Sequence, residues 1–123
     1  MSDPNFLILY VENPTASTAF YGALLGRTAV EASATFAMFA LESGMMLGLW
    51  ATHTVEPAAK SAGGGGEIAF AVEGNAKVDA IHAEWGGRGL PIVQPPSKMD
   101  FGYTFVALDP DGHRLRVFAP GVS

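Results

Sequence analysis

The side chains of this sequence that most readily bind metals or transfer protons are three histidines, and their spacing assembles no site. His53, His82 and His113 lie far apart, with no His-x-His pair and no His-Glu-x-x-His motif. The chain has no cysteine, which excludes thiolate nucleophiles, zinc–thiolate centres and disulfides. We therefore expect surface or capping histidines, and no metal or other cofactor.

A run of four glycines, residues 63–66, is the other motif that could carry chemistry. Glycine-rich loops cradle phosphate when Lys-Ser/Thr and a helix follow them. Here Glu67 and an apolar, strand-like segment follow instead. The run is interpreted as the end of a flexible linker at about residues 52–66.

Length and composition exclude several classes of function. The chain has 123 residues, enough for one domain, and its 7 Lys and Arg form no basic run for nucleic acid. No apolar stretch approaches the roughly 18 residues of a membrane span, and no signal peptide is recognisable. Charged residues make up 15%, against roughly 25% in an average domain, so we expect surface hidden in a homo-oligomer. The lack of cysteine fits a cytoplasmic protein.

An internal repeat organises the chain. Residues 7–12 (LILYVE) and 68–73 (IAFAVE) are short apolar runs of strand character, offset by 61 positions. A helix is predicted after each run. The first begins at Asn13-Pro14, with asparagine as N-cap and proline at the first helical position, and the second begins at Asn75.

Three further strand-like segments follow each predicted helix. Aligning the turn glycines Gly44 and Gly112 leaves seven extra residues in the second copy, placed in a loop at 95–101. We expect one α+β domain, residues 1–123, with unit one at about 5–51 and unit two at about 67–120. The predicted later strands are 28–31, 35–41 and 45–51 in unit one, and 91–94, 103–108 and 113–119 in unit two.

Two βαβββ units, with FYGALLG at 20–26 and DPDGHRLRV at 109–117, resemble the vicinal oxygen chelate superfamily. That superfamily includes glyoxalase I, extradiol dioxygenases, fosfomycin-modifying thiol transferases and bleomycin-resistance proteins. The resemblance implies a cupped mixed sheet in each unit and a domain-swapped homodimer. It does not specify a function within the superfamily.

The resemblance also implies four metal-ligand positions, on the first and last strand of each unit. In this sequence they are Phe6, Gly48, Glu67 and Arg116. Phe6 and Gly48 donate nothing, and Arg116 is a permanent cation that would repel a divalent ion. We therefore expect no metal site, with Gly48 clearing floor space inside the cup.

Strand alternation predicts what lines the cup instead. Trp50 shares a face with Gly48, and a ten-residue offset seen in the dioxygenases places Met38 and its neighbour Phe36 inward. Glu67 and Arg116 could anchor a ligand or pair with each other. An apolar, aromatic lining with few polar groups suits a flat, drug-sized ligand. The expected ligand contacts are Phe6, Phe36, Met38, Trp50, Glu67, Phe101, Tyr103 and Arg116.

Within the superfamily, the segments 48–50 and 101–117 are most similar to the antibiotic-binding branch of bleomycin-, mitomycin- and phenazine-resistance proteins. That resemblance implies metal-free sequestration of a planar aromatic molecule, with no catalysis. One alternative is an enzyme that uses a displaced metal, or Glu67 as a base with its pKa raised by burial. Another is a module that only dimerises. Phe101 and Tyr103 could form a lid or merely cover the sheet edge.

Overall fold

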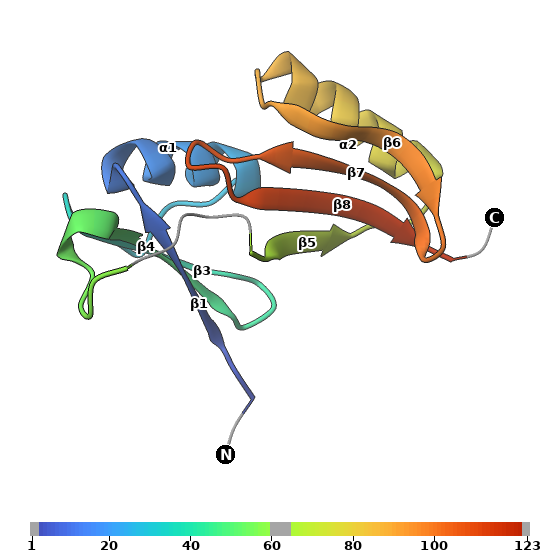
Figure 1. The fold of residues 1–123 in the computed structure, drawn as a ribbon. Coiled ribbons are helices and arrows are strands. Elements are labelled where there is room, and N and C mark those ends of the chain that lie inside the picture. The colour runs from blue at the N-terminus through green and yellow to red at the C-terminus, as the bar shows by residue number, and fades with distance from the viewer. Residues whose placement is uncertain (1–2, 60–64, 122–123) are drawn as a thin grey trace. The chain divides into compact units, whose positions relative to one another are not determined.

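The computed structural model describes residues 3–59 and 65–121, so part of the predicted linker, including Gly63 and Gly64, lies outside the described residues. The chain divides into two compact units, Met1–Ala62 and Gly63–Ser123 (Figure 1). Each unit has its own four-stranded mixed sheet and one longer helix. The predicted α+β class with two βαβββ units is confirmed.

Unit one is built on a sheet with the strand order β1-β4-β3-β2. β1 and β4 are parallel, whereas β3 is antiparallel to both β4 and β2. The long connection between the parallel strands contains the helix, as parallel pairing requires. The elements are β1 (Phe6–Val11), α1 (Pro14–Leu25), β2 (Glu31–Ala32), β3 (Phe36–Ala40), β4 (Met46–Ala51) and the 3₁₀ helix η1 (Thr52–Thr54).

Helix α1 begins and ends where its capping residues predict. The Asn13 side chain accepts a hydrogen bond from the Ala16 backbone N–H at 3.2 Å, and Pro14 occupies the first turn. Gly26 ends the helix in the left-handed conformation, at φ 64°. α1 packs on β3 and β4, so the opposite face of the sheet is not covered by this helix.

Unit two repeats the arrangement with the strand order β5-β8-β7-β6. β5 and β8 are parallel, and β7 is antiparallel to β8 and β6. Helix α2 lies along one face of this sheet (Figure 1). The elements are β5 (Glu67–Ala71), α2 (Asn75–Gly87), β6 (Ile92–Met99), β7 (Gly102–Leu108) and β8 (Arg114–Pro120).

The largest departure from the sequence prediction is β6. The predicted loop at 95–101 is wrong, because β6 continues through Met99 and pairs Lys98 with Tyr103. Its register shifts between Gln94 and Ser97, around two prolines that cannot donate ladder hydrogen bonds. The strand is at the sheet edge, where proline and bulges are tolerated. The seven extra residues therefore lengthen a hairpin.

Smaller corrections concern element ends. The second strand of unit one is Glu31–Ala32 rather than 28–31, since the Ser33 side chain bonds the backbone of Phe36 and holds the chain in a turn.

Each unit buries a core between its helix and its sheet. Phe39, Leu49 and Tyr21 are buried in unit one, and Phe105 and Trp85 are buried in unit two. Phe39, Leu49 and Phe105 occupy helix-facing positions of their strands, and Tyr21 and Trp85 come from the helices. Alternation then turns the neighbouring residues to the other sheet face.

No helix of residues 3–59 and 65–121 is long and apolar enough to cross a membrane.

Candidate functional site

The helix-free face of the unit-one sheet is aromatic and exposed. Phe6, Ile8 and Tyr10 lie at alternate positions of β1 and are 42%, 43% and 42% exposed. The alternate residues Leu47 and Leu49 of β4 are buried under the helix. Because apolar side chains of this size are seldom left so accessible in a row, this face is a candidate binding surface.

Gly48 lies at the centre of this face, and two aromatic rings cover it. A Cβ added at Gly48 would lie 3.0 Å from Cε1 of Phe6 and 3.1 Å from Cζ of Phe36. The expectation that Gly48 leaves floor space empty is therefore wrong. The missing side chain lets Phe6 and Phe36 close over the strand where a metal ligand would otherwise stand.

Trp50 extends the same surface. It pairs with Phe36 on β3 and with Tyr10 on β1, and its ring meets Tyr10 edge-on with centroids 6.3 Å apart. Met38 pairs with Gly48, as the ten-residue offset predicts. The predicted contacts Phe6, Phe36, Met38 and Trp50 thus occupy one face of one sheet, which we call the aromatic face.

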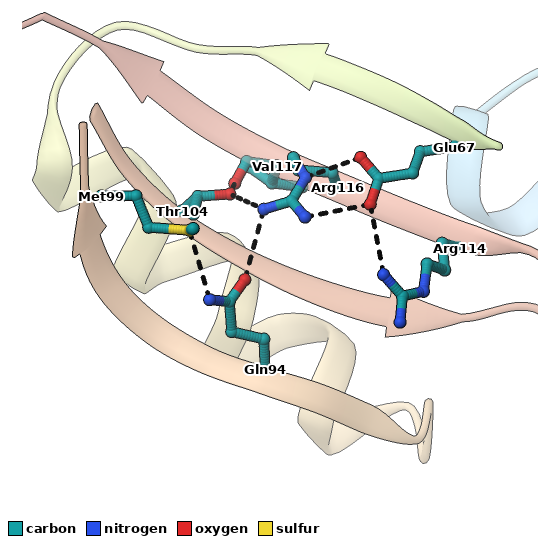
Figure 2. Close-up of polar contacts among 7 residues, drawn as sticks. All are labelled: Glu67, Gln94, Met99, Thr104, Arg114, Arg116 and Val117. Atoms are coloured by element: carbon teal, nitrogen blue, oxygen red, sulfur yellow. Dashed lines mark hydrogen bonds and ion pairs between the residues drawn. The ribbon is translucent and has the colours of Figure 1, made fainter. Parts of the chain in front are cut away.

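The helix-free face of unit two carries an ion pair (Figure 2). Arg116 donates from Nε to Oε1 of Glu67 at 2.7 Å and from Nη2 to Oε2 at 2.9 Å. This two-point geometry is the strongest form of a guanidinium–carboxylate contact. The two side chains are 17% and 29% exposed, so water screens the pair only in part. Of the two roles left open for Glu67 and Arg116, pairing is observed.

Further polar partners fix the Arg116 guanidinium in place. Its Nη1 donates to Oε1 of Gln94 and to Oγ1 of Thr104, each at 3.2 Å (Figure 2). Thr104 in turn donates to the Val117 carbonyl at 2.9 Å. Sequence reasoning does not single out Gln94 or Thr104. Strand pairing could have found Thr104, which lies opposite Phe118 in the register and so shares the Arg116 face.

The ion pair changes the acidity of Glu67. The hydrogen bond from Arg116 is the main cause that lowers the pKa of the Glu67 carboxyl, and it outweighs the opposing effect of partial burial. The expectation of a raised pKa is therefore wrong. A general base is most effective with a pKa near the working pH. Glu67 is instead a firmly ionised, hydrogen-bonded carboxylate, which disfavours the enzyme alternative that depends on it.

Phe101 and Tyr103 lie on different sides of the unit-two sheet. The Phe101 ring centroid is 5.6 Å from Cζ of Arg116 and 6.0 Å from the Phe118 ring. The Tyr103 hydroxyl instead donates to Asp79 of α2 at 2.7 Å. Tyr103 thus lies on the helix side, and we leave it out of the proposed ligand contacts. We call the surface made by Glu67, Gln94, Phe101, Thr104, Arg114, Arg116 and Phe118 the polar face.

The histidines have structural surroundings. Nδ1 of His113 lies 2.7 Å from Oδ2 of Asp109 in the β7–β8 hairpin, and the His82 ring meets Phe105 edge-on at 5.2 Å. His53 lies in η1. Within residues 3–59 and 65–121, no group of three His, Cys, Asp or Glu side chains could hold a metal ion.

Comparison with known proteins places this fold. The family model of the Glyoxalase/Bleomycin resistance protein/Dioxygenase superfamily matches residues 4–117. The chain belongs to this superfamily. The residues at the four positions where the resemblance places metal ligands do not fit a metal ion. Phe6 and Gly48 offer no donor, and Arg116 is already bonded to the carboxylate of Glu67.

Relatives of the chain extend from close to remote. The phenazine antibiotic resistance protein EhpR of Enterobacter agglomerans is 28% identical over 117 residues, covering 93% of this chain and 89% of that protein. A solution structure from Agrobacterium tumefaciens is 58% identical with a TM-score of 0.91, covering 99% of this chain and all of that one. A glyoxalase-related enzyme from Fulvimarina pelagi is 19% identical with a TM-score of 0.84, covering 97% and 88%, and it shares the fold alone.

Proposed function

We propose that the protein binds a planar aromatic small molecule and sequesters it without chemical change. The observation that carries this proposal is the aromatic face, where Phe6 and Phe36 cover Gly48 at the family's metal-ligand position. The similarity to a phenazine antibiotic resistance protein supports an antibiotic as the ligand. Binding alone would then protect the cell.

Apolar burial and stacking would supply the free energy of binding. Trp50 is half-buried, and its ring is held edge-on by Tyr10, so a flat ligand meets a preorganised surface. An aromatic pair contributes roughly 0.5–1.5 kcal/mol beyond the burial of its area. Met38 adds a flexible, polarizable contact that adapts to different ring systems. Together these side chains favour planar ligands without selecting one compound.

In this proposal the polar face of unit two is a second, separate surface for ligand contacts. Phe101 offers an exposed ring, and Glu67 with Arg116 offers a fixed polar surface beside it. Because the two charges satisfy each other, this pair can bind polar edges of a ligand without a large desolvation cost. Neither group is placed to transfer a proton at neutral pH, in agreement with binding as the whole function.

Tryptophan fluorescence tests the proposal, because the two tryptophans have different surroundings. Trp50 lies on the aromatic face, whereas Trp85 is only 6% exposed and packs against Phe70 and Phe105. A protein with Trp85→Phe reports on Trp50 alone. We expect phenazine to quench that signal saturably at micromolar concentration, through direct stacking.

The matched variant is Trp50→Phe, which keeps an aromatic ring and leaves Trp85 as the reporter. We expect little quenching, and affinity weakened about fivefold by calorimetry, because the smaller ring stacks over less area. Equal quenching of both single-tryptophan proteins would show that the aromatic face is not the binding surface.

We further propose that the protein is a homodimer, and the domain-swapped form that the resemblance implies is part of this proposal. The low fraction of charged residues, 15%, supports it. Light scattering of the purified protein should give twice the chain mass of 12.9 kDa. A single chain mass at micromolar concentration would contradict the dimer.

A further inference from the structure

We propose that the polar face of unit two binds an organic anion, a carboxylate carried on an aromatic ring, and that Arg114 contacts the carboxylate. This inference deepens the proposed function and rests on it for the aromatic part of the ligand. Arg114 lies outside the contacts that the sequence predicts. The charges of Glu67, Arg114 and Arg116 are distributed unevenly on the strand pair β5 and β8.

Arg116, the more obvious anion-binding residue, has little capacity left. A guanidinium has five N–H groups. One from Nε and one from Nη2 are donated to Glu67, and two from Nη1 are donated to Gln94 and Thr104. Only one N–H of Arg116 remains for a ligand. An incoming carboxylate would have to displace Glu67, which is already in the best two-point geometry.

Arg114 has the opposite character. It precedes Arg116 by two residues on β8, so it projects from the same sheet face, and its side chain is 50% exposed. Arg114 forms one long ion pair among the described residues, in which its Nη1 lies 3.7 Å from Oε2 of Glu67. That distance is beyond hydrogen bonding, so the guanidinium N–H groups of Arg114 can donate to the carboxylate of a ligand.

Charge balance supports an anionic ligand. The cluster drawn in Figure 2 holds two guanidinium groups and one carboxylate, so its net charge is +1. The whole chain has a formal charge of −5, so this positive spot is local and does not reflect a basic protein. A cationic ligand would be repelled here, and a neutral one would gain nothing from Arg114.

An aromatic surface lies on the other side of Arg116. Phe101 is 44% exposed, its ring is 5.6 Å from Cζ of Arg116, and Phe118 supports it edge-on. Arg114, Arg116 and Phe118 alternate along β8 at roughly 6.6 Å per two residues. Arg114 and the exposed Phe101 ring therefore lie on either side of the Arg116 guanidinium, where an extended fused-ring carboxylate would contact both.

Calorimetry with a matched pair of probes tests this inference. Phenazine-1-carboxylate and phenazine differ in the anionic group alone. At pH 7 and low salt we expect the carboxylate to bind about fivefold more tightly, the effect of one half-exposed ion pair. The preference should shrink as sodium chloride is added, because salt screens exposed charges.

Arg114→Gln should abolish the preference while the neutral probe binds as before. The matched control is Arg88→Gln, which removes the same charge from the end of α2, where Arg88 pairs with Glu84. That variant should keep the fivefold preference. Glu67→Gln should increase it, because the cluster then carries two positive charges. Amide shifts in β8 and at Phe101 on adding the carboxylate would locate the site.

The outcomes separate this inference from the proposed function. If neither probe binds, both are overturned. If both probes bind equally well, or if Arg114→Gln keeps the preference, sequestration of aromatics stands and the anion site is refuted. If Arg88→Gln reduces the preference as much as Arg114→Gln, overall charge is responsible and the assignment to Arg114 is wrong.

Discussion

Single residues decide what replaces the family's metal chemistry in this protein. In unit one, the lack of a side chain at Gly48 allows the rings of Phe6 and Phe36 to meet over this position. In unit two, Arg116 and Glu67 neutralise each other in place of two metal ligands. The same two structural positions thus become an apolar surface in one unit and a polar one in the other. Both outcomes remove the open coordination site that a catalytic metal needs.

Gly48 gives a sharp test at this scale. In Gly48→Ala the new methyl group would lie 3.0 Å from Phe6 and 3.1 Å from Phe36, so both rings must move apart. We expect the free energy of unfolding to fall by about 1 kcal/mol and phenazine binding to weaken, because overpacking disturbs the aromatic face. Urea denaturation and calorimetry measure the two effects.

Gly86→Ala is the control for Gly48→Ala. Gly86 lies in α2, and a Cβ there meets nothing within 4 Å. Alanine favours the helix by up to about 1 kcal/mol over glycine, so this variant should be as stable as the parent or more so. If Gly48→Ala behaves like Gly86→Ala, the two rings do not pack over Gly48 as described.

The faces of the site residues could be predicted from sequence, but their contacts could not. Alternation along a strand correctly places Phe36, Met38 and Trp50 on one side of their sheet. It cannot tell whether Arg116 turns to Glu67 or to a ligand, since that choice depends on side-chain rotamers and on Gln94 and Thr104. The sign of the Glu67 pKa shift is unpredictable for the same reason.

At the scale of elements, the β7–β8 hairpin is held by one buried carboxylate. Asp109 accepts the backbone N–H groups of Asp111 and His113 at 2.9 and 2.8 Å, and its other oxygen lies 2.7 Å from Nδ1 of His113. This contact sets the direction of β8, which carries both arginines of the polar face. The hydrogen bond to Asp109 is the main cause that raises the pKa of His113 above its ordinary value of 6.5.

The raised pKa predicts how stability depends on pH. Because the folded state holds the His113 proton more tightly than the unfolded chain, this stabilisation is fully present below pH 6.5. It is lost as the pH rises through the folded-state pKa. Asp109→Asn should lower the pKa of His113 and flatten this part of the pH profile. NMR titration of His113 and urea denaturation on both sides of neutrality measure both effects.

Asp79→Asn is the control for the hairpin, because it removes a carboxylate that is bonded to Tyr103 and not to His113. It should leave the His113 titration unchanged. An unaltered His113 titration in Asp109→Asn would mean that the pair does not set the acidity of the imidazole.

Element boundaries were predictable where local chemistry fixes them. Asn13, Pro14 and Gly26 act on α1 through neighbouring backbone groups, so sequence locates that helix closely. β6 was unpredictable because its pairing depends on β7 and not on its own residues. Its proline pair suggests a loop, yet the edge position lets the strand continue around them.

At the scale of the whole molecule, one repeated topology carries two different surfaces. In both units the first strand lies at a sheet edge and pairs in parallel with the last strand, and a helix covers one face of the sheet. The repeat is readable from sequence because core positions keep their apolar pattern in both copies. The identity of the ligand is not readable, since shape and charge on the open faces arise from contacts between distant residues.

In the proposed function, this member of the superfamily binds aromatic ligands with no metal. The most direct measurement is calorimetric titration of chelator-treated protein with phenazine, with and without added zinc, manganese, nickel or ferrous iron. We predict the same affinity and stoichiometry in every case, because Phe6, Gly48 and Arg116 provide no metal ligand. Binding that disappears after chelation and returns with one divalent ion would contradict the account.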